Sequence, residues 1–301
     1  MSASFRVTQR SASLGVQANL QRGISALQAL QDKVSSGREI SRPSDSPGGT
    51  SSALNLRSDI TRLEQFDRNA NDGGGWLAES DNALQGSAQV LRRARDLGVS
   101  AINAAVTATG REALAVEVDG LRSQLLSLAN SSRLGRPLFS GNALPGVGQP
   151  NVAFDATGTY VGDAGTVVRP VADGASVQVN LTGPDVFGPA ANNAFKVLTD
   201  LAANIRSNSP TISPTSIDDI DIALNRIQTG LATVGARTNQ LEALQGRNLI
   251  SRDNRLNSLN EIESIDLPKT LTDLKLQELA YQASLSAAAR VIQPSLLDFL
   301  R

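Results

Sequence analysis

The stretch that decides the fold, residues 267–292, reads LPKTLTDLKLQELAYQASLSAAARVI. Its larger side chains recur at alternating steps of four and three residues, which is the repeat of helices that pack side by side as a coiled coil. The positions that follow this repeat are Leu267, Leu271, Leu274, Glu278, Tyr281, Leu285, Ala288 and Ile292. The pattern therefore predicts a helix with one apolar face close to the C-terminal end of the sequence.

A second seam lies in the first helical segment, residues 8–36. Its positions also alternate steps of four and three: Leu20, Ile24, Leu27, Gln31 and Val34. An isolated amphipathic helix is marginally stable in water, so neither seam is expected to stand alone. The two stripes must pack on each other, on further copies of the chain or on a partner, which predicts an assembly module. The alternative is a bundle formed within one chain, without any partner.

Two local signals predict a joint between the first helix and a second one. Gly37 is expected to end the first helix, because glycine adopts the left-handed conformation freely. Ser46 followed by Pro47 predicts the N-cap and first position of the second helix. Three glycines at 73–75 cost about 3 kcal/mol of helix propensity relative to alanine, so propensity alone predicts a turn there.

The rest of the chain returns to helical patterns after a short β-like region. Thr109 and Glu112 have the spacing of a capping box for a third helix that ends near Ser132. Between residues 141 and 189, Gly, Pro, Val, Thr and Asp are frequent, which is typical of short strands and turns. The predicted strand runs are 158–161, 166–169 and 176–180. Helical patterns resume at 195–205 and 220–241.

The composition excludes several classes of function. The 301 residues include no cysteine and no histidine, so there is no thiolate or imidazole for a nucleophile, a catalytic triad or a metal site. Lys and Arg total 28 against 29 for Asp and Glu, which argues against a nucleic-acid binder. No run of about 20 apolar residues is present, which argues against a membrane span. The first 30 residues lack an unbroken apolar stretch and a cleavage site, which argues against a secretory signal.

Four features have both a functional and a structural interpretation. Asp218, Asp219 and Asp221 could form a cation site, but acidic residues near a helix N-terminus are favoured by the helix dipole. The glycines at 73–75 lack the Gly-Lys-Ser/Thr ending of a phosphate loop. Trp76 is interpreted as a packing anchor. Turn formation explains the aspartates of the β-like region, which are Asp155, Asp163, Asp173 and Asp185. We expect no metal, no cofactor and no enzymatic activity.

Several strings resemble the bacterial flagellin family. VSSGREISRPSD at 34–45 is similar to the N-terminal signature of that family. RNANDG at 68–73 and LRRARDLGV at 91–99 are similar to its next two blocks, and QPSLLDFL at 293–300 is similar to its C-terminal end. Within the family, the chain resembles the type that joins the hook to the filament, through RPSDSP at 42–47 and RPLFSG at 136–141. The three glycines at 73–75 depart from the family pattern, which usually has one glycine or none there.

The resemblance implies a structural subunit of the bacterial flagellum, exported unfolded by the flagellar type III apparatus without a cleaved signal and located outside the cell. It implies one continuous helix over residues 47–103, against the propensity of the glycines. The implied partners are other copies of the chain in a homo-oligomeric ring, an adjacent hook-associated protein on the hook side and filament flagellin on the distal side. An export chaperone is implied to bind residues 267–301.

The predicted fold is mainly α: a long-helix coiled-coil bundle formed by both chain ends, with a small inserted β-subdomain. The predicted domains are 1–42 with 266–301 (terminal coiled coil), 43–140 with 190–265 (helical bundle core) and 141–189 (β-subdomain). The residues expected at the assembly interface are Leu20, Ile24, Leu27, Val34, Leu267, Leu271, Leu274, Tyr281, Leu285, Ile292, Leu296 and Phe299.

Both chain ends are expected to be largely disordered until assembly supplies their neighbours. Two alternatives remain open. One is a filament flagellin, the main propeller subunit. The other is a hydrolase that uses the middle domain, which the lack of histidine and of a recognisable carboxylate pair disfavours.

Overall fold

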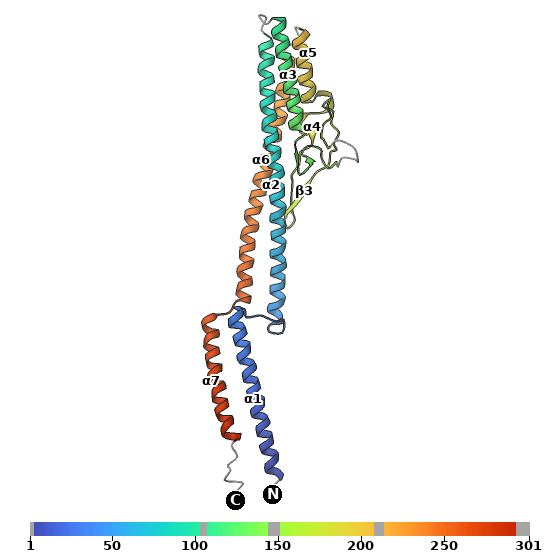
Figure 1. Ribbon diagram of the computed structural model, residues 1–301. Helices are drawn as coiled ribbons and strands as arrows, with labels where there is room; N and C mark the ends of the chain where they lie inside the picture. Colours follow the sequence, from blue (N-terminus) through green and yellow to red (C-terminus); the bar gives the residue numbers. More distant parts are fainter. Residues whose placement is uncertain (1–2, 103–106, 144–150, 208–213, 293–301) are drawn as a thin grey trace. The chain divides into compact units, whose positions relative to one another are not determined.

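Helices dominate the computed structural model, which describes residues 3–102, 107–143, 151–207 and 214–292 (Figure 1). The longer helices are α1 (Ala3–Ser36), α2 (Pro47–Ala101), α3 (Ala108–Ala129), α5 (Ala194–Ser207), α6 (Pro214–Glu263) and α7 (Leu267–Ile292). Two compact units make up the chain, residues 1–61 with 252–301 and residues 62–251. The boundary between the units falls within α2 and α6. The mainly helical fold with small inserted sheets is confirmed.

The core of the unit at 62–251 follows heptad repeats on its two longest helices. On α2, Leu77, Leu84 and Leu91 are fully buried and lie seven residues apart. On α6, the buried residues at the same spacing are Ile220, Ile227, Val234 and Leu241. A seven-residue repeat keeps one apolar stripe facing a neighbouring helix, so the periodicity in the sequence predicted this seam correctly. Helices α3 and α5 pack beside each other and add to the same core.

The glycines at 73–75 lie inside α2, which runs without interruption through them. The turn expected from propensity is therefore wrong. A Cβ at Gly73 would come within 2.9 Å of the Val179 side chain, and one at Gly75 would collide with the Arg133 guanidinium. The missing side chains let the β region approach the α2 backbone closely. This packing offsets a propensity cost of about 3 kcal/mol, as expected when tertiary contacts stabilise a helix.

Two short hairpins form the β region. Strands β3 (Val168–Ala172) and β4 (Ala175–Gln178) pair antiparallel around Gly174, whose φ is +69°. Strands β1 (Ser132–Arg133) and β2 (Arg136–Pro137) also pair antiparallel. The predicted strand at 158–161 is wrong in extent, because only an isolated bridge between Phe154 and Tyr160 forms there.

Four of the seven phenylalanines gather where the β region meets α5 and the short helix α4 (Gly183–Phe187). Phe139 packs edge-on against Phe187 at 5.3 Å between ring centroids, and the Phe154 and Phe195 rings lie 4.9 Å apart. All four are at most 1% exposed. Four of the ten aromatic residues are thus concentrated in one cluster, while the heptad seams of α2 and α6 are aliphatic.

Helix ends test the local signals in the sequence. The Ser46 hydroxyl accepts a hydrogen bond from the Gly49 backbone N–H at 3.2 Å, so the predicted N-cap of α2 is confirmed. The capping box at Thr109 is wrong: Thr107 caps α3 by accepting from the Gly110 N–H at 3.1 Å. Helix α3 ends at Ala129, before the predicted Ser132. The next side chain, Asn130, binds backbone groups of the β region instead of continuing the helix.

Candidate assembly interface

Helices α1 and α7 lie side by side and run in opposite directions (Figure 1). On α1, the partly buried positions that share one face are Val16, Leu20, Gly23, Leu27, Leu30 and Val34. They alternate steps of four and three, as the seam of a helix pair does. The face that α1 turns toward α7 is therefore the stripe centred on Gly23.

The closest approach of the two helices is at Gly23. A Cβ at this position would lie 3.3 Å from the Tyr281 ring. The Gln277 side-chain amide also points at the Gly23 carbonyl oxygen, at 3.4 Å. Glycine therefore admits the tyrosine ring against the α1 backbone. The heptad pattern did not single out Gly23, because a glycine adds nothing to an apolar stripe.

The predicted interface residues divide into two groups. Leu20, Leu27, Val34, Leu274 and Tyr281 are partly buried in the α1–α7 pair. A second group is exposed: Ile24 (41%), Leu267 (49%), Leu271 (42%) and Leu285 (43%). Ile292 lies in α7 but its side chain is outside the described part, and Leu296 and Phe299 lie outside the described residues altogether.

Additional exposed apolar side chains widen the second group. Leu14 is 59% exposed on α1, and Leu276 and Leu279 on α7 are 60% and 62% exposed. Each α7 residue advances by about 100° around the helix, so Leu276 and Leu279 lie on a different side of α7 from Leu274 and Tyr281. Pairing of α1 with α7 thus covers one face of each helix and leaves apolar side chains beside it uncovered.

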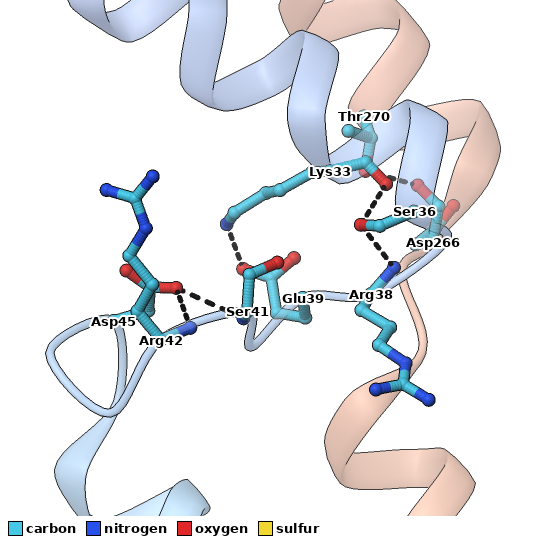
Figure 2. Close-up of polar contacts among 9 residues, drawn as sticks. All are labelled: Lys33, Ser36, Arg38, Glu39, Ser41, Arg42, Asp45, Asp266 and Thr270. Carbon is cyan, nitrogen blue, oxygen red and sulfur yellow. Dashed lines mark hydrogen bonds and ion pairs between the residues drawn. The ribbon is translucent and has the colours of Figure 1, made fainter.

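Two connectors meet where the helix pair begins (Figure 2). The segment after α1 forms an antiparallel bridge between Arg38 and Ser264, the latter in the link from α6 to α7. The Glu39 N–H donates to the Glu263 carbonyl at 2.7 Å, and the Ile265 N–H donates to the Gly37 carbonyl at 3.3 Å. The two links are therefore joined to each other by backbone hydrogen bonds.

Side chains hold the first connector in shape. The Asp45 carboxylate accepts hydrogen bonds from the backbone N–H groups of Ser41, at 3.1 Å, and Arg42, at 2.8 Å (Figure 2). The N–H of Arg42, and then that of Ser41, lower the pKa of Asp45 below its ordinary value, because both bonds favour the charged carboxylate. Lys33 at the end of α1 forms an ion pair with Glu39.

The second connector carries its own cap. The Asp266 carboxylate accepts from the Lys269 N–H at 3.1 Å, and the Thr270 hydroxyl donates to the Asp266 carbonyl at 2.8 Å. These bonds satisfy backbone groups at the start of α7. Arg57 on α2 forms an ion pair with Glu263 at the end of α6, at 2.8 Å. Both connectors are thus built from local polar contacts, with no apolar core of their own.

Several of the acidic and aromatic candidates outside this region have structural partners. Asp221 forms an ion pair with Arg95 at 2.8 Å, which joins α6 to α2. Trp76 is 4% exposed, and the Arg136 guanidinium carbon lies 5.9 Å from the centre of its ring. Burial raises the pKa of Tyr160 to about 12, and its hydroxyl donates to backbone carbonyls. In the described ranges no group of three or more metal-ligating side chains occurs.

Comparison with known proteins finds relatives among the bacterial flagellins. Residues 7–143 match the model of the bacterial flagellin N-terminal helical region. The flagellin of Bacillus subtilis (strain 168) is 25% identical over 99% of this chain and 100% of its own length. The resemblance to bacterial flagellins expected from the sequence strings is therefore confirmed along most of the chain.

Two hook-associated or junction proteins are similar as well, one in sequence and one in fold. Flagellar hook-associated protein 3 of Escherichia coli (strain K12) is 24% identical over 88% of this chain and 92% of its own length. The crystal structure of the flagellar junction protein FlgL from Legionella pneumophila matches with a TM-score of 0.59 and 18% identity, over 70% of this chain and 99% of that chain. This chain is a flagellar structural protein and not an enzyme. None of its described helices is long and apolar enough to cross a membrane.

Proposed function

We propose that the chain is the subunit that joins the flagellar hook to the filament, and that it assembles through its terminal helices. The observation that carries the assembly role is the set of apolar side chains on α1 and α7 that their own pairing leaves exposed, among them Ile24, Leu271 and Leu285. Apolar surface that one chain cannot cover favours association with other chains.

The junction position is supported by the sequence strings at 42–47 and 136–141 and by the hook-associated relative. The proposed neighbours are copies of the same chain in a ring, a hook-associated protein on the hook side and filament flagellin on the distal side. The proposed location is outside the cell. An export chaperone would bind the C-terminal segment at 267–301, because an amphipathic helix fits an apolar groove.

The proposed structural roles follow the three predicted domains. Residues 1–42 with 266–301 would form the inner coiled coil, and residues 43–140 with 190–265 the middle bundle. Residues 141–189 would form the outer β-subdomain. The buried heptad seams of α2 and α6 support a rigid middle bundle, and the polar connectors support a separate terminal part.

One observation favours a second candidate, a filament flagellin. The Bacillus subtilis flagellin aligns over a larger share of this chain, 99%, than the hook-associated relative, 88%. A filament subunit and a junction subunit would both assemble through their terminal helices. They would differ in their position in the flagellum and in the number of copies.

Immunogold labelling of intact flagella separates the two candidates. An antibody to residues 151–180 should label one short zone at the boundary between hook and filament. A strain that lacks the gene serves as the negative control. Label along the whole filament would overturn the junction proposal in favour of the filament flagellin, and the absence of flagellar label would overturn both.

A further inference from the structure

The hairpin of β3 and β4 packs on α2 where that helix contains its three consecutive glycines, residues 73–75 (Figure 1). At Gly73 the α2 backbone meets both the end of the hairpin and α6, because a Cβ there would lie 2.9 Å from Val179 and 3.2 Å from Leu241. Glycine is the poorest helix former after proline, so this part of α2 is the least able to stay helical by itself. The hairpin therefore lies where α2 most needs tertiary support.

A β-bulge joins the hairpin to α6. The pairing of β3 with β4 slips between Pro170 and Ala172, so Val171 is an extra residue in the strand. The Val171 side chain is fully buried, and its carbonyl oxygen accepts a hydrogen bond from the Asn248 side-chain amide on α6 at 2.6 Å. Because Asn248 is itself buried, loss of this bond would leave the carbonyl oxygen unsatisfied.

The same strand is also bonded to α2. The Asn69 side-chain amide donates to the Pro170 carbonyl oxygen at 2.9 Å, one residue before the carbonyl that binds α6. Arg169 forms an ion pair with Asp72, which directly precedes the glycines, at 2.9 Å. Consecutive residues of β3 thus hold α2 and α6 at one level, as a brace across the two helices.

We propose that this brace is a conformational device. Docking of the hairpin makes α2 continuous through residues 73–75, and its release turns the same segment into a flexible joint, since a helix of poor intrinsic propensity persists only while packing supports it. Asn69 and Pro170 are 101 positions apart, so α2 becomes one rigid helix only after the β region has folded onto it. The inference goes beyond the proposed function, because it does not depend on where in the flagellum the subunit lies.

Hydrogen exchange measured residue by residue on the purified chain tests the device. Asn248→Ala removes the bond to the Val171 carbonyl, so the amides at 73–79 should exchange about tenfold faster, the order of effect of an unsatisfied buried carbonyl. Val171→Ala loosens the hairpin and leaves both helices unchanged, and it should accelerate the same amides at least threefold. Amides around Leu84 should keep their wild-type rates, because the core of α2 does not depend on the brace. Wild-type rates at 73–79 in both variants would overturn the inference.

A matched control removes a contact between the helices that does not involve the hairpin. The Gln245 side-chain amide on α6 donates directly to Asn71 on α2 at 3.0 Å. Gln245→Ala should therefore change exchange at 73–79 less than twofold. An acceleration equal to that of Asn248→Ala would assign the effect to helix contacts in general and overturn the role of the hairpin.

Alanine at the middle glycine tests whether low helix propensity is the reason for the joint. A Cβ at Gly74 would make only ordinary contact with Leu241, at 3.9 Å. Gly74→Ala added to Asn248→Ala should slow exchange at 73–79 about fivefold, the difference in helix propensity between the two residues, although the lost bond is not restored. No slowing in the double variant would contradict the joint.

Spin labels measure the rigidity of α2 itself, because the chain has no cysteine of its own. Glu64→Cys and Asn82→Cys place labels at two exposed positions on either side of the glycines, about 27 Å apart at about 1.5 Å per residue. The distribution of distances should be narrow in the otherwise wild-type chain and broad in Asn248→Ala. A narrow distribution in both chains would overturn the device.

Discussion

Replacement of Leu285 by aspartate tests the assembly role of α7 most sharply. The side chain is 43% exposed in the isolated chain. Full burial of a leucine contributes about 1.5–3 kcal/mol, so covering the exposed part contributes about 0.6–1.3 kcal/mol for each copy. An aspartate in the same place would bury an unpaired charge, which costs several kcal/mol more. Assembly should therefore fail, although the charge is tolerated while the site faces water.

The matched variants separate charge from lost contact. Leu285→Ala removes only the contact, so each association step should weaken about three- to ninefold, by the conversion of 1.4 kcal/mol to a factor of ten. Ser286→Asp places the same charge on the next residue, which is already polar and exposed, and should change assembly less than threefold.

The assay combines motility with sedimentation of the purified chain. Leu285→Asp should abolish motility, and the unit at 62–251 should unfold at its wild-type temperature, because Leu285 lies in the other unit. An intact, motile flagellum built with Leu285→Asp would refute the reasoning. So would a matching loss of function with Ser286→Asp, since the effect would then come from charge on α7 in general.

Two further predictions concern the parts that position the interface. Gly73→Val should lower the melting temperature of the unit at 62–251 by several degrees in calorimetry, because a Cβ there would lie 2.9 Å from the buried Val179 side chain and overpacking costs about 1–3 kcal/mol. Gly120→Val, where the space is open, should have a smaller effect, and equal losses would contradict the close approach. The pKa of Asp45 is lowered from 3.8 in the folded chain, so its contribution is present above that value and is lost as the pH falls through the folded pKa. In the wild-type chain, hydrogen exchange at the Ser41 and Arg42 amides should therefore accelerate as acid protonates Asp45, and Asp45→Ala should lack this acceleration. The same pH dependence in Asp45→Ala as in the wild type would contradict the cap.

Local signals predicted much of this fold. The heptad leucines of α2 and α6, the Ser46 cap and the stop at Gly37 depend on residues close in sequence, and each has the predicted structure. The continuous α2 helix was predicted from the family resemblance and not from propensity. The glycines at 73 and 75 leave space for the Val179 and Arg133 side chains, which lie far along the chain.

The register of the terminal pair could not be read from the sequence. The stripe Leu20, Ile24 and Leu27 and the stripe Leu20, Gly23 and Leu27 share two positions. The structure selects the second because the Tyr281 ring needs the space at Gly23. The bridge between Arg38 and Ser264 joins residues more than 200 positions apart, and no local pattern marks such a pair.

Hydrogen exchange on the purified chain and on assembled flagella tests the central claim, that assembly completes the burial of the terminal helices. Amides at residues 15–35 and 270–292 should exchange rapidly in the isolated chain at low concentration, because pairing covers only one face of each helix. They should become strongly protected in flagella, while the core of α2 around Leu84 is protected in both states. Strong protection of both terminal segments in the isolated chain would contradict the account.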